Sequence, residues 1–143
     1  MPVNSSHVGV LIVAALLGLG AQLALADNLP IHLSGAEETP PVSTSASAVG
    51  TIRVYADRTI SGSIKTSGIA GTMAHVHLAP LGQSGPPIIT LTKTSDGVWS
   101  VLAGRKLTED QYRAYKAGDL YVNVHSTEHA SGEIRAQLKP ESP

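Results

Sequence analysis

The sequence predicts an all-β domain, an antiparallel sandwich or barrel, on three observations. Short segments in which apolar and polar residues alternate recur from residue 49 onward, a pattern typical of half-buried strands. Turns rich in Gly, Pro and Ser separate these segments at the spacing expected of an antiparallel sheet. A single segment has the features of a helix. The expected strands are 49–55, 59–66, 74–78, 88–94, 98–102, 120–125 and 133–138.

The composition of this 143-residue chain excludes several classes of function. Ten Lys and Arg against eleven Asp and Glu give a net charge of −1, without the basic block that a nucleic-acid-binding surface needs. The absence of cysteine excludes disulfides, thiolate metal sites, iron–sulfur clusters and cysteine nucleophiles. The sequence has no P-loop and no dinucleotide-binding glycine motif. We therefore expect one domain, no nucleic-acid partner, and histidine as the main reactive side chain.

The N-terminal segment has the pattern of an export signal. A nearly unbroken apolar run over residues 8–25 ends in the small-x-small motif Ala-Leu-Ala, directly before Asp27. This pattern predicts a signal peptide over 1–26 and a mature domain over 27–143, periplasmic or secreted, with its core at about 31–138. The alternative is a retained membrane anchor, because about 18 apolar residues can span a bilayer. After cleavage we expect no membrane association.

The helix is predicted just before the strand at 120–125. Thr108 and Gln111 form a capping box, in which each side chain bonds to the backbone N–H of the other residue. Acidic Glu109 and Asp110 lie in the first turn, where they suit the helix dipole. Gly118 is a suitable terminator. We interpret this helix as a structural strap across a sheet end.

Residues 27–48 are expected to form an extended edge or a loop, because the adjacent prolines Pro40 and Pro41 are incompatible with a central strand. Glu37 and Glu38 would point to opposite sides of an extended chain, so they are poorly placed to act as an acid–base pair. We interpret them as solvated or as capping backbone groups in a turn. No serine lies in a nucleophile elbow, and we predict no catalytic residues.

The histidines carry the main functional signal. His75 and His77 are two residues apart in a strand, so their side chains point to the same face. The same alternation puts polar side chains on one face of the strands at 120–125 and 133–138. If these three strands are neighbours, one sheet face collects His75, His77, Asn123, His125, Glu133 and Arg135.

We interpret this face as a metal site with His75, His77 and His125 as ligands. Residues at i and i+2 of a strand lie about 6.5–7 Å apart, a span that two imidazoles can close around one ion. Three imidazoles with an oxygen or nitrogen partner suit Cu(II) or Zn(II). The alternative is a hydrogen-bonded polar cluster without metal, in which Glu133 or Asn123 orients a histidine and Arg135 pairs with Glu133. The candidates for a fourth ligand are Glu133, His129 and His32.

Six stretches together resemble the CHRD domain, a module first described in chordin and found singly in many exported bacterial proteins. They occur in the family's order and cover nearly all of 31–138. This sequence differs from the residues usual in the family at Thr39, Ser126, His129-Ala130 and Ala136. The stretches are LSGAEETPPV (33–42), AHVH (74–77), GPPI (85–88), LT (107–108), GDLYVNVHS (118–126) and GEIRAQL (132–138).

The resemblance implies an immunoglobulin-like antiparallel β-sandwich outside the cytoplasm, in a family without an established enzymatic reaction. We therefore expect an exported, non-enzymatic binding module whose partner is Cu(II), Zn(II) or an extracytoplasmic protein. One alternative is a structural or adhesive sandwich that makes protein contacts without metal. A third hypothesis is an enzyme similar to copper/zinc superoxide dismutase, based on His75-x-His77 and the Gly/Pro loop that follows. That family also uses a bridging histidine, a zinc-binding aspartate and usually a disulfide, which cannot form without cysteine.

Overall fold

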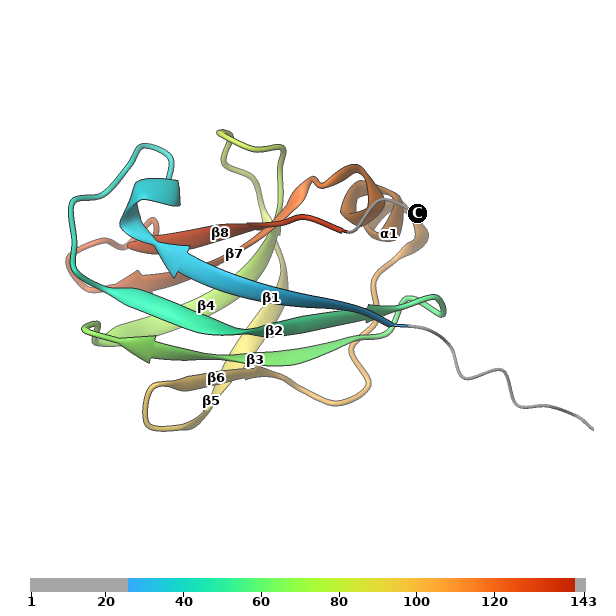
Figure 1. Ribbon diagram of the computed structural model, residues 1–143, viewed down its shortest axis with the longest axis horizontal. Helices are drawn as coiled ribbons and strands as arrows, with labels where there is room; N and C mark the ends of the chain where they lie inside the picture. Colours follow the sequence, from blue (N-terminus) through green and yellow to red (C-terminus); the bar gives the residue numbers. More distant parts are fainter. Residues whose placement is uncertain (1–25, 141–143) are drawn as a thin grey trace, which may run out of the picture.

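The computed structural model describes residues 26–140 of the chain. It contains eight strands, one 3-10 turn and one α-helix (Figure 1). The predicted signal peptide lies outside the described residues, apart from Ala26, and stays a prediction. The elements are β1 (Ala26–Ser34), η1 (Gly35–Glu37), β2 (Ser47–Tyr55), β3 (Ile60–Ser67), β4 (Gly71–Leu78), β5 (Pro87–Ser95), β6 (Val98–Val101), α1 (Glu109–Ala117), β7 (Leu120–Ser126) and β8 (Ile134–Leu138).

The predicted all-β antiparallel fold with one short helix is confirmed. The strands pair in the order β1-β2-β3-β6-β5-β4-β7-β8 and close into a barrel-like sandwich. Every pairing between neighbouring strands is antiparallel. The ring closes between β1 and β8 through the single register pair Ser34↔Arg135.

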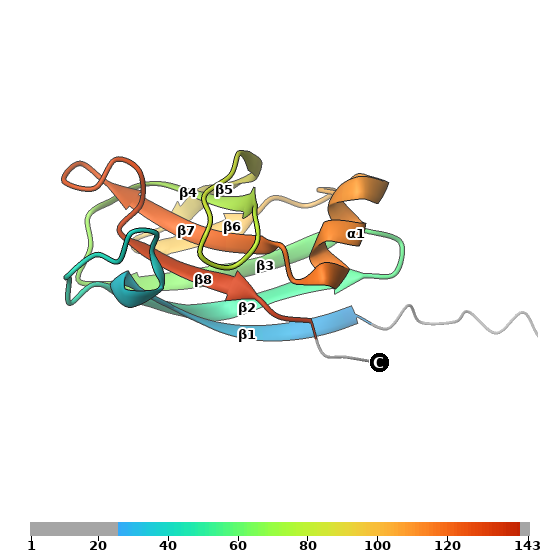
Figure 2. The ribbon, with the colours of Figure 1, turned by 90° about the horizontal axis from the view of Figure 1, so that it is seen from above.

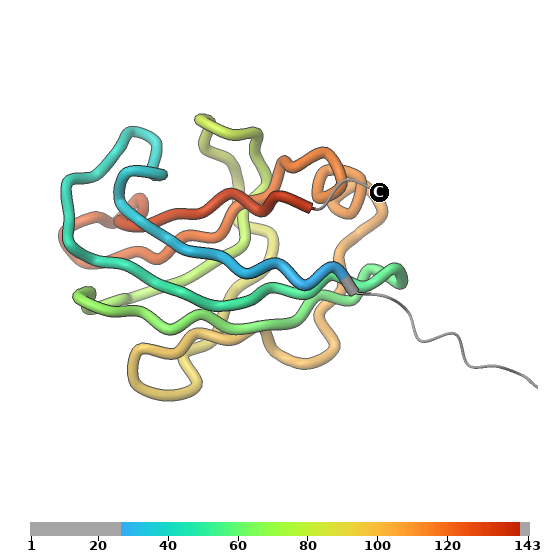
Figure 3. The backbone as a smooth tube through the Cα atoms, viewed as in Figure 1, coloured from blue at the N-terminus to red at the C-terminus, as the bar shows by residue number. Residues whose placement is uncertain are grey.

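Two crossover connections bring β4 and β7 together. After β3 the chain crosses to β4, and β6 and β5 lie between these two strands in the sheet. The second connection contains α1 and leads from β6 to β7. The backbone trace in Figure 3 follows both connections. As a result, β7 lies between β4 and β8, the condition under which the sequence predicts a shared polar face.

The barrel interior is filled by every second residue of each strand, since successive side chains point to opposite faces. Ala74 and Val76 of β4 are fully buried there, as are Val122 and Val124 of β7. In β7 and β8, however, the residues of the other parity are buried as well. The outward face of these strands is therefore covered by other parts of the chain. The interior core also includes Leu33, Ile52, Ile60, Ile64, Leu91, Trp99, Ile134 and Leu138.

Helix α1 lies at one end of the barrel (Figure 1). Its capping box is confirmed: the Gln111 N–H donates to Thr108 Oγ1 at 3.2 Å, and the Thr108 N–H donates to Gln111 Oε1 at 2.9 Å. Gly118 ends the helix with φ of 82°. Tyr115 is fully buried, and its hydroxyl donates to Asp27 Oδ2 at 2.8 Å. The helix is thereby held to the beginning of β1.

The expectation for residues 27–48 is partly wrong. Its first part is a regular strand, β1, which pairs with β2 over nine residues. Pro30 lies within this strand, where proline is tolerated because the other edge of β1 has only one register pair with β8. The double proline is correctly placed outside any strand. No helix within residues 26–140 is long and apolar enough to cross a membrane.

Candidate metal centre

The polar side chains of β4, β7 and β8 share the outward face of the barrel. The register places His75 opposite Asn123, and Asn123 opposite Arg135 on the next strand. His77 is opposite Tyr121 in the same way. The three strands are therefore neighbours, as the sequence argument requires. We call the outward side chains His75, His77, Tyr121, Asn123, His125, Arg135 and Gln137 the polar face.

Three histidines of the polar face form a compact group. His75, His77 and His125 each offer a ring nitrogen, and these atoms all lie within 4.8 Å of one another. The Nδ1 atom of His75 is 3.1 Å from Nε2 of His125. The ring centroids are separated by 5.4 Å for His75–His77, 5.1 Å for His75–His125 and 5.9 Å for His77–His125. We call this group the histidine triad.

Backbone carbonyls orient two rings of the triad. Nδ1 of His77 lies 2.8 Å from the Gly85 carbonyl oxygen, and Nδ1 of His125 lies 2.9 Å from that of Ala130. Because a carbonyl oxygen only accepts, each Nδ1 carries the proton and each Nε2 keeps a lone pair. Nε2 of His77 is buried without a hydrogen-bond partner. Metal-binding histidines use the same arrangement, in which the second ring nitrogen donates to a fixed acceptor.

Two histidines of the triad, His75 and His77, are held toward the neutral form that binds metals. Burial lowers the pKa of His75, and the neighbouring His125 and His77 lower it further. Burial also lowers the pKa of His77, against the opposing effect of the hydrogen bond to Gly85. Protons therefore compete weakly for the ring nitrogens of His75 and His77 near neutral pH.

Arg135 is a buried cation beside the triad. Its side chain is 1% exposed, and its Cζ atom lies 3.5 Å from the centroid of the Tyr121 ring. The Tyr121 ring also stacks on His77, at 4.8 Å between centroids and 8° between planes. Arg135 donates to the Gln83 carbonyl at 2.8 Å and to Gln137 Oε1 at 3.0 Å. Among residues 26–140 it joins no ion pair, so the pairing with Glu133 that belonged to the alternative, metal-free cluster is wrong.

Two loops cover the polar face (Figure 2). The loop over residues 79–86 accepts hydrogen bonds from Arg135, His77 and Gln137 through its carbonyl oxygens. The loop that follows η1 adds Thr39, whose Oγ1 lies 3.4 Å from Nη1 of Arg135. These contacts account for the burial of both faces of β7 and β8.

Glu38 is a site residue that the sequence analysis did not predict. It is 7% exposed, and its Oε1 accepts from Nδ2 of Asn123 at 3.4 Å. Its Oε2 also accepts from the Thr39 N–H at 3.3 Å, so the expectation of a backbone cap holds and that of a solvated side chain is wrong. Burial raises the pKa of Glu38 despite these hydrogen bonds. Only the folding of its loop onto β7 brings Glu38 here, and no local pattern signals this.

The candidate fourth ligands Glu133 and His129 do not belong to the triad. Glu133 Oε1 accepts from Thr44 Oγ1 at 2.7 Å. Burial raises the pKa of Glu133, but hydrogen bonds from Ser126 and Thr44 and the nearby His129 outweigh it, so the pKa lies below its usual value. Within residues 26–140 the triad is the sole group of three such ligands, without the second set that a copper/zinc pair needs.

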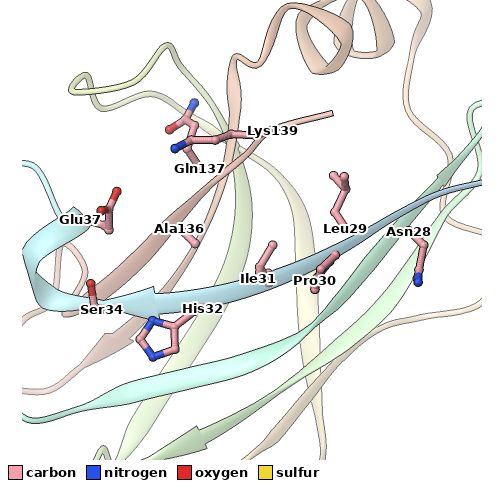
Figure 4. A pocket seen from close by; sticks show the side chains of 10 residues that line it. All are labelled: Asn28, Leu29, Pro30, Ile31, His32, Ser34, Glu37, Ala136, Gln137 and Lys139. Carbon is pink, nitrogen blue, oxygen red and sulfur yellow. The ribbon is translucent and has the colours of Figure 1, made fainter. Parts of the chain in front are cut away.

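The remaining candidate, His32, lies elsewhere. It is exposed on β1 and lines a groove of about 410 Å³ between β1 and β8 (Figure 4). The groove follows the stretch where these two strands diverge beyond Ser34↔Arg135, and Glu37, Gln137 and Lys139 also line it. His32 is therefore a suitable control for the triad.

A family model for the CHRD domain matches residues 29–138, which span all eight strands. The chain belongs to the CHRD domain family. No curated protein and no solved structure matches it. The match includes every residue of the polar face and therefore the whole triad. Membership and the triad support a β-fold binding module.

Proposed function

We propose that this CHRD domain is an exported, non-enzymatic module that binds one Cu(II) or Zn(II) ion through His75, His77 and His125. The observation that supports it best is the triad itself, three ring nitrogens within 4.8 Å of one another. Carbonyl acceptors already fix two of the rings, so that each Nε2 carries a lone pair. The module would act as a buffer or carrier of the ion.

The donor set suits these two ions. All three donors are imidazole nitrogens, which Cu(II) and Zn(II) favour, and cysteine is absent from the chain. Metal–nitrogen bonds are about 2.0–2.1 Å long. Closing the triad around an ion therefore requires small ring movements, which the half-exposed His75 side chain can make.

A structural or adhesive role is the second candidate. It is supported by the hydrogen bonds of Arg135 and Gln137, which fix the loop over 79–86 without any metal. In that role the loops would present a contact surface to an extracytoplasmic protein. The two functions differ in what substitution of the triad histidines should do. In the first it removes metal binding, and in the second it changes only the stability of the protein.

Metal binding by the purified protein tests the proposal. We expect one Cu(II) or Zn(II) per wild-type chain by isothermal titration calorimetry and metal analysis. His77→Ala should weaken binding by at least about 100-fold, because a direct ligand matters more than the outer partners, whose loss costs about 10–100-fold. His32→Ala removes a histidine outside the triad and should bind as wild type does.

Circular dichroism must show that both variants keep the fold. Absence of binding by the wild type at micromolar metal, or equal binding by His77→Ala, would overturn the proposal. The structural role would then be favoured, and the search would turn to protein partners.

A further inference from the structure

We infer that the ion held by the triad keeps an open fourth position, where Asn123 Oδ1 holds an exchangeable water that small anions can replace. This inference rests on the proposed function, and it concerns what the bound ion can take from solution. It makes Asn123 a binding residue of the site and Glu38 a positioning residue that acts through Asn123.

Asn123 lies among the three histidines. It is directly opposite His75 across the β4–β7 pair, and such partners have Cβ atoms about 4.5–5.5 Å apart. His125 lies two residues further along β7 on the same face, and His77 is the diagonal neighbour on β4. Asn123 is 2% exposed, so the triad and the covering loops enclose it.

The amide oxygen of Asn123 has no partner. Oδ1 is buried without a hydrogen bond, as is Nε2 of His77. Both atoms are acceptors, since the proton of His77 lies on Nδ1. A proton on Nε2 of His77 would satisfy both atoms through a hydrogen bond to Asn123, but burial lowers the pKa of His77 and disfavours that proton. A cation with a donor between the two atoms is the other way to satisfy them, since an unsatisfied buried polar atom costs about 1–3 kcal/mol. An ion on His77 together with a water that donates to Asn123 satisfies both.

Glu38 sets the orientation of the amide. Its Oε1 accepts from Asn123 Nδ2, so Oδ1 points away from Glu38. Gly132 packs against both groups, and any side chain at that position would displace them. The acceptor of Asn123 is thus aimed by its surroundings rather than free to rotate.

A water fits the fourth position better than a protein ligand. Within residues 26–140 no fourth His, Asp or Glu joins the group, and three protein ligands plus water is the usual composition of an open zinc site. His75 is only partly buried, which gives solvent a route to this position.

Charge favours an anion as the replacing ligand. Three neutral imidazoles leave the full charge of the ion uncompensated. Arg135 adds a second buried positive charge nearby, and it joins no salt bridge among residues 26–140. The Glu38 carboxyl interacts electrostatically with Arg135 and His125, but burial raises its pKa and so disfavours its negative charge. Small anions should therefore enter the site in preference to neutral ligands of similar size.

Azide binding to the Cu(II)-loaded full chain tests the inference. We expect one azide per copper, seen as a new charge-transfer absorption band and a shifted electron paramagnetic resonance spectrum. Asn123→Leu removes the hydrogen bond to the water. It should raise azide affinity about tenfold, the effect of one hydrogen bond.

Two controls keep the test decisive. Asn123→Ala adds no bulk near Gly132 and should change azide affinity in the same direction, whereas His32→Ala should leave it unchanged. A copper-loaded wild type whose absorption and electron paramagnetic resonance spectra do not change with azide would overturn the inference. So would loss of copper in both Asn123 variants, since Asn123 would then be a direct ligand. Either result differs from failure of the proposed function, in which the wild type binds no copper.

Discussion

At the scale of single residues, Gly132 controls how tightly the loops close over the polar face. Its φ of 130° is in a region that residues with a side chain rarely adopt. A Cβ atom there would collide with Oε1 of Glu38 and Nδ2 of Asn123. The position therefore requires glycine for both its backbone conformation and the space it leaves.

We predict that Gly132→Ala lowers the free energy of unfolding by about 3 kcal/mol, since it combines backbone strain with a collision between buried groups. Gly104→Ala is the matched control, because Gly104 also has positive φ, 79°, but nothing within 4 Å of the added Cβ. It should cost only about 1 kcal/mol. Urea denaturation measures both values, and equal losses would show that the collision is relieved without cost.

The residues of the triad follow from strand parity, whereas their surroundings do not. Alternation along the strands is sufficient to put His75, His77 and His125 on one outward face, once the strands are neighbours. Glu38 reaches this face through a loop whose path depends on the whole fold. Arg135 stacks on Tyr121 instead of pairing with a carboxylate, a choice between partners that spacing cannot decide.

At the scale of elements, a hydrogen bond from Tyr115 and a salt bridge from Lys116, both to Asp27, connect the helix to the barrel. Tyr115 is buried under α1, and its hydroxyl bonds to Asp27 at the beginning of β1. Burial raises the pKa of Tyr115, and the bond to Asp27 and the carboxylate charge raise it further. The hydroxyl therefore remains a donor at any ordinary pH.

We expect Tyr115→Phe to lower the free energy of unfolding by about 1.5–3 kcal/mol, the usual contribution of a hydrogen bond to a charged group. Tyr112 is only partly buried and stacks on Tyr115. Tyr112→Phe removes the same hydroxyl where no carboxylate is bonded to it, and it should cost less than about 0.5 kcal/mol. Thermal and chemical denaturation compare the two. A similar small loss of unfolding free energy in both variants would mean that water replaces the Tyr115 hydroxyl as the partner of Asp27 at little cost.

The strands that the sequence predicts are those with regular alternation. Their observed bounds differ from the expected ones by a few residues at most, as for β2, which begins at Ser47 rather than residue 49. Strand β1 was missed because Pro30 and the polar residues around it weaken the pattern of a strand. Its pairing with β2 over its full length compensates for this weak local preference.

At the scale of the whole molecule, the buried histidines connect stability to pH. The pKa values of His75 and His77 lie below 6.5 in the folded chain, mainly because of burial. In the unfolded chain they return to about 6.5. Between the lowered values and 6.5 the unfolded state therefore binds more protons, and the free energy of unfolding falls as pH falls. Glu38 acts in the opposite sense above 4.5, because its pKa is raised.

We predict that the metal-free wild type loses stability as pH falls below about 7, and that His75→Ala/His77→Ala shows a shallower dependence over the same range. Urea titrations at several pH values give the two slopes. Identical slopes would assign the pH dependence to other groups. Saturating metal should flatten the wild-type dependence near neutral pH, since the ion holds both rings unprotonated.

The single register pair between β1 and β8 has a consequence for self-association. Each strand leaves part of one edge without a backbone ladder, and such edges invite pairing with a strand of another molecule. Pro30 removes one backbone donor from β1, and Lys139 puts a charge directly after β8. Proline and lysine are the residues that natural sheets use to discourage edge-to-edge aggregation. The incomplete closure of the barrel is thus combined with protection against amyloid-like growth at the same edges.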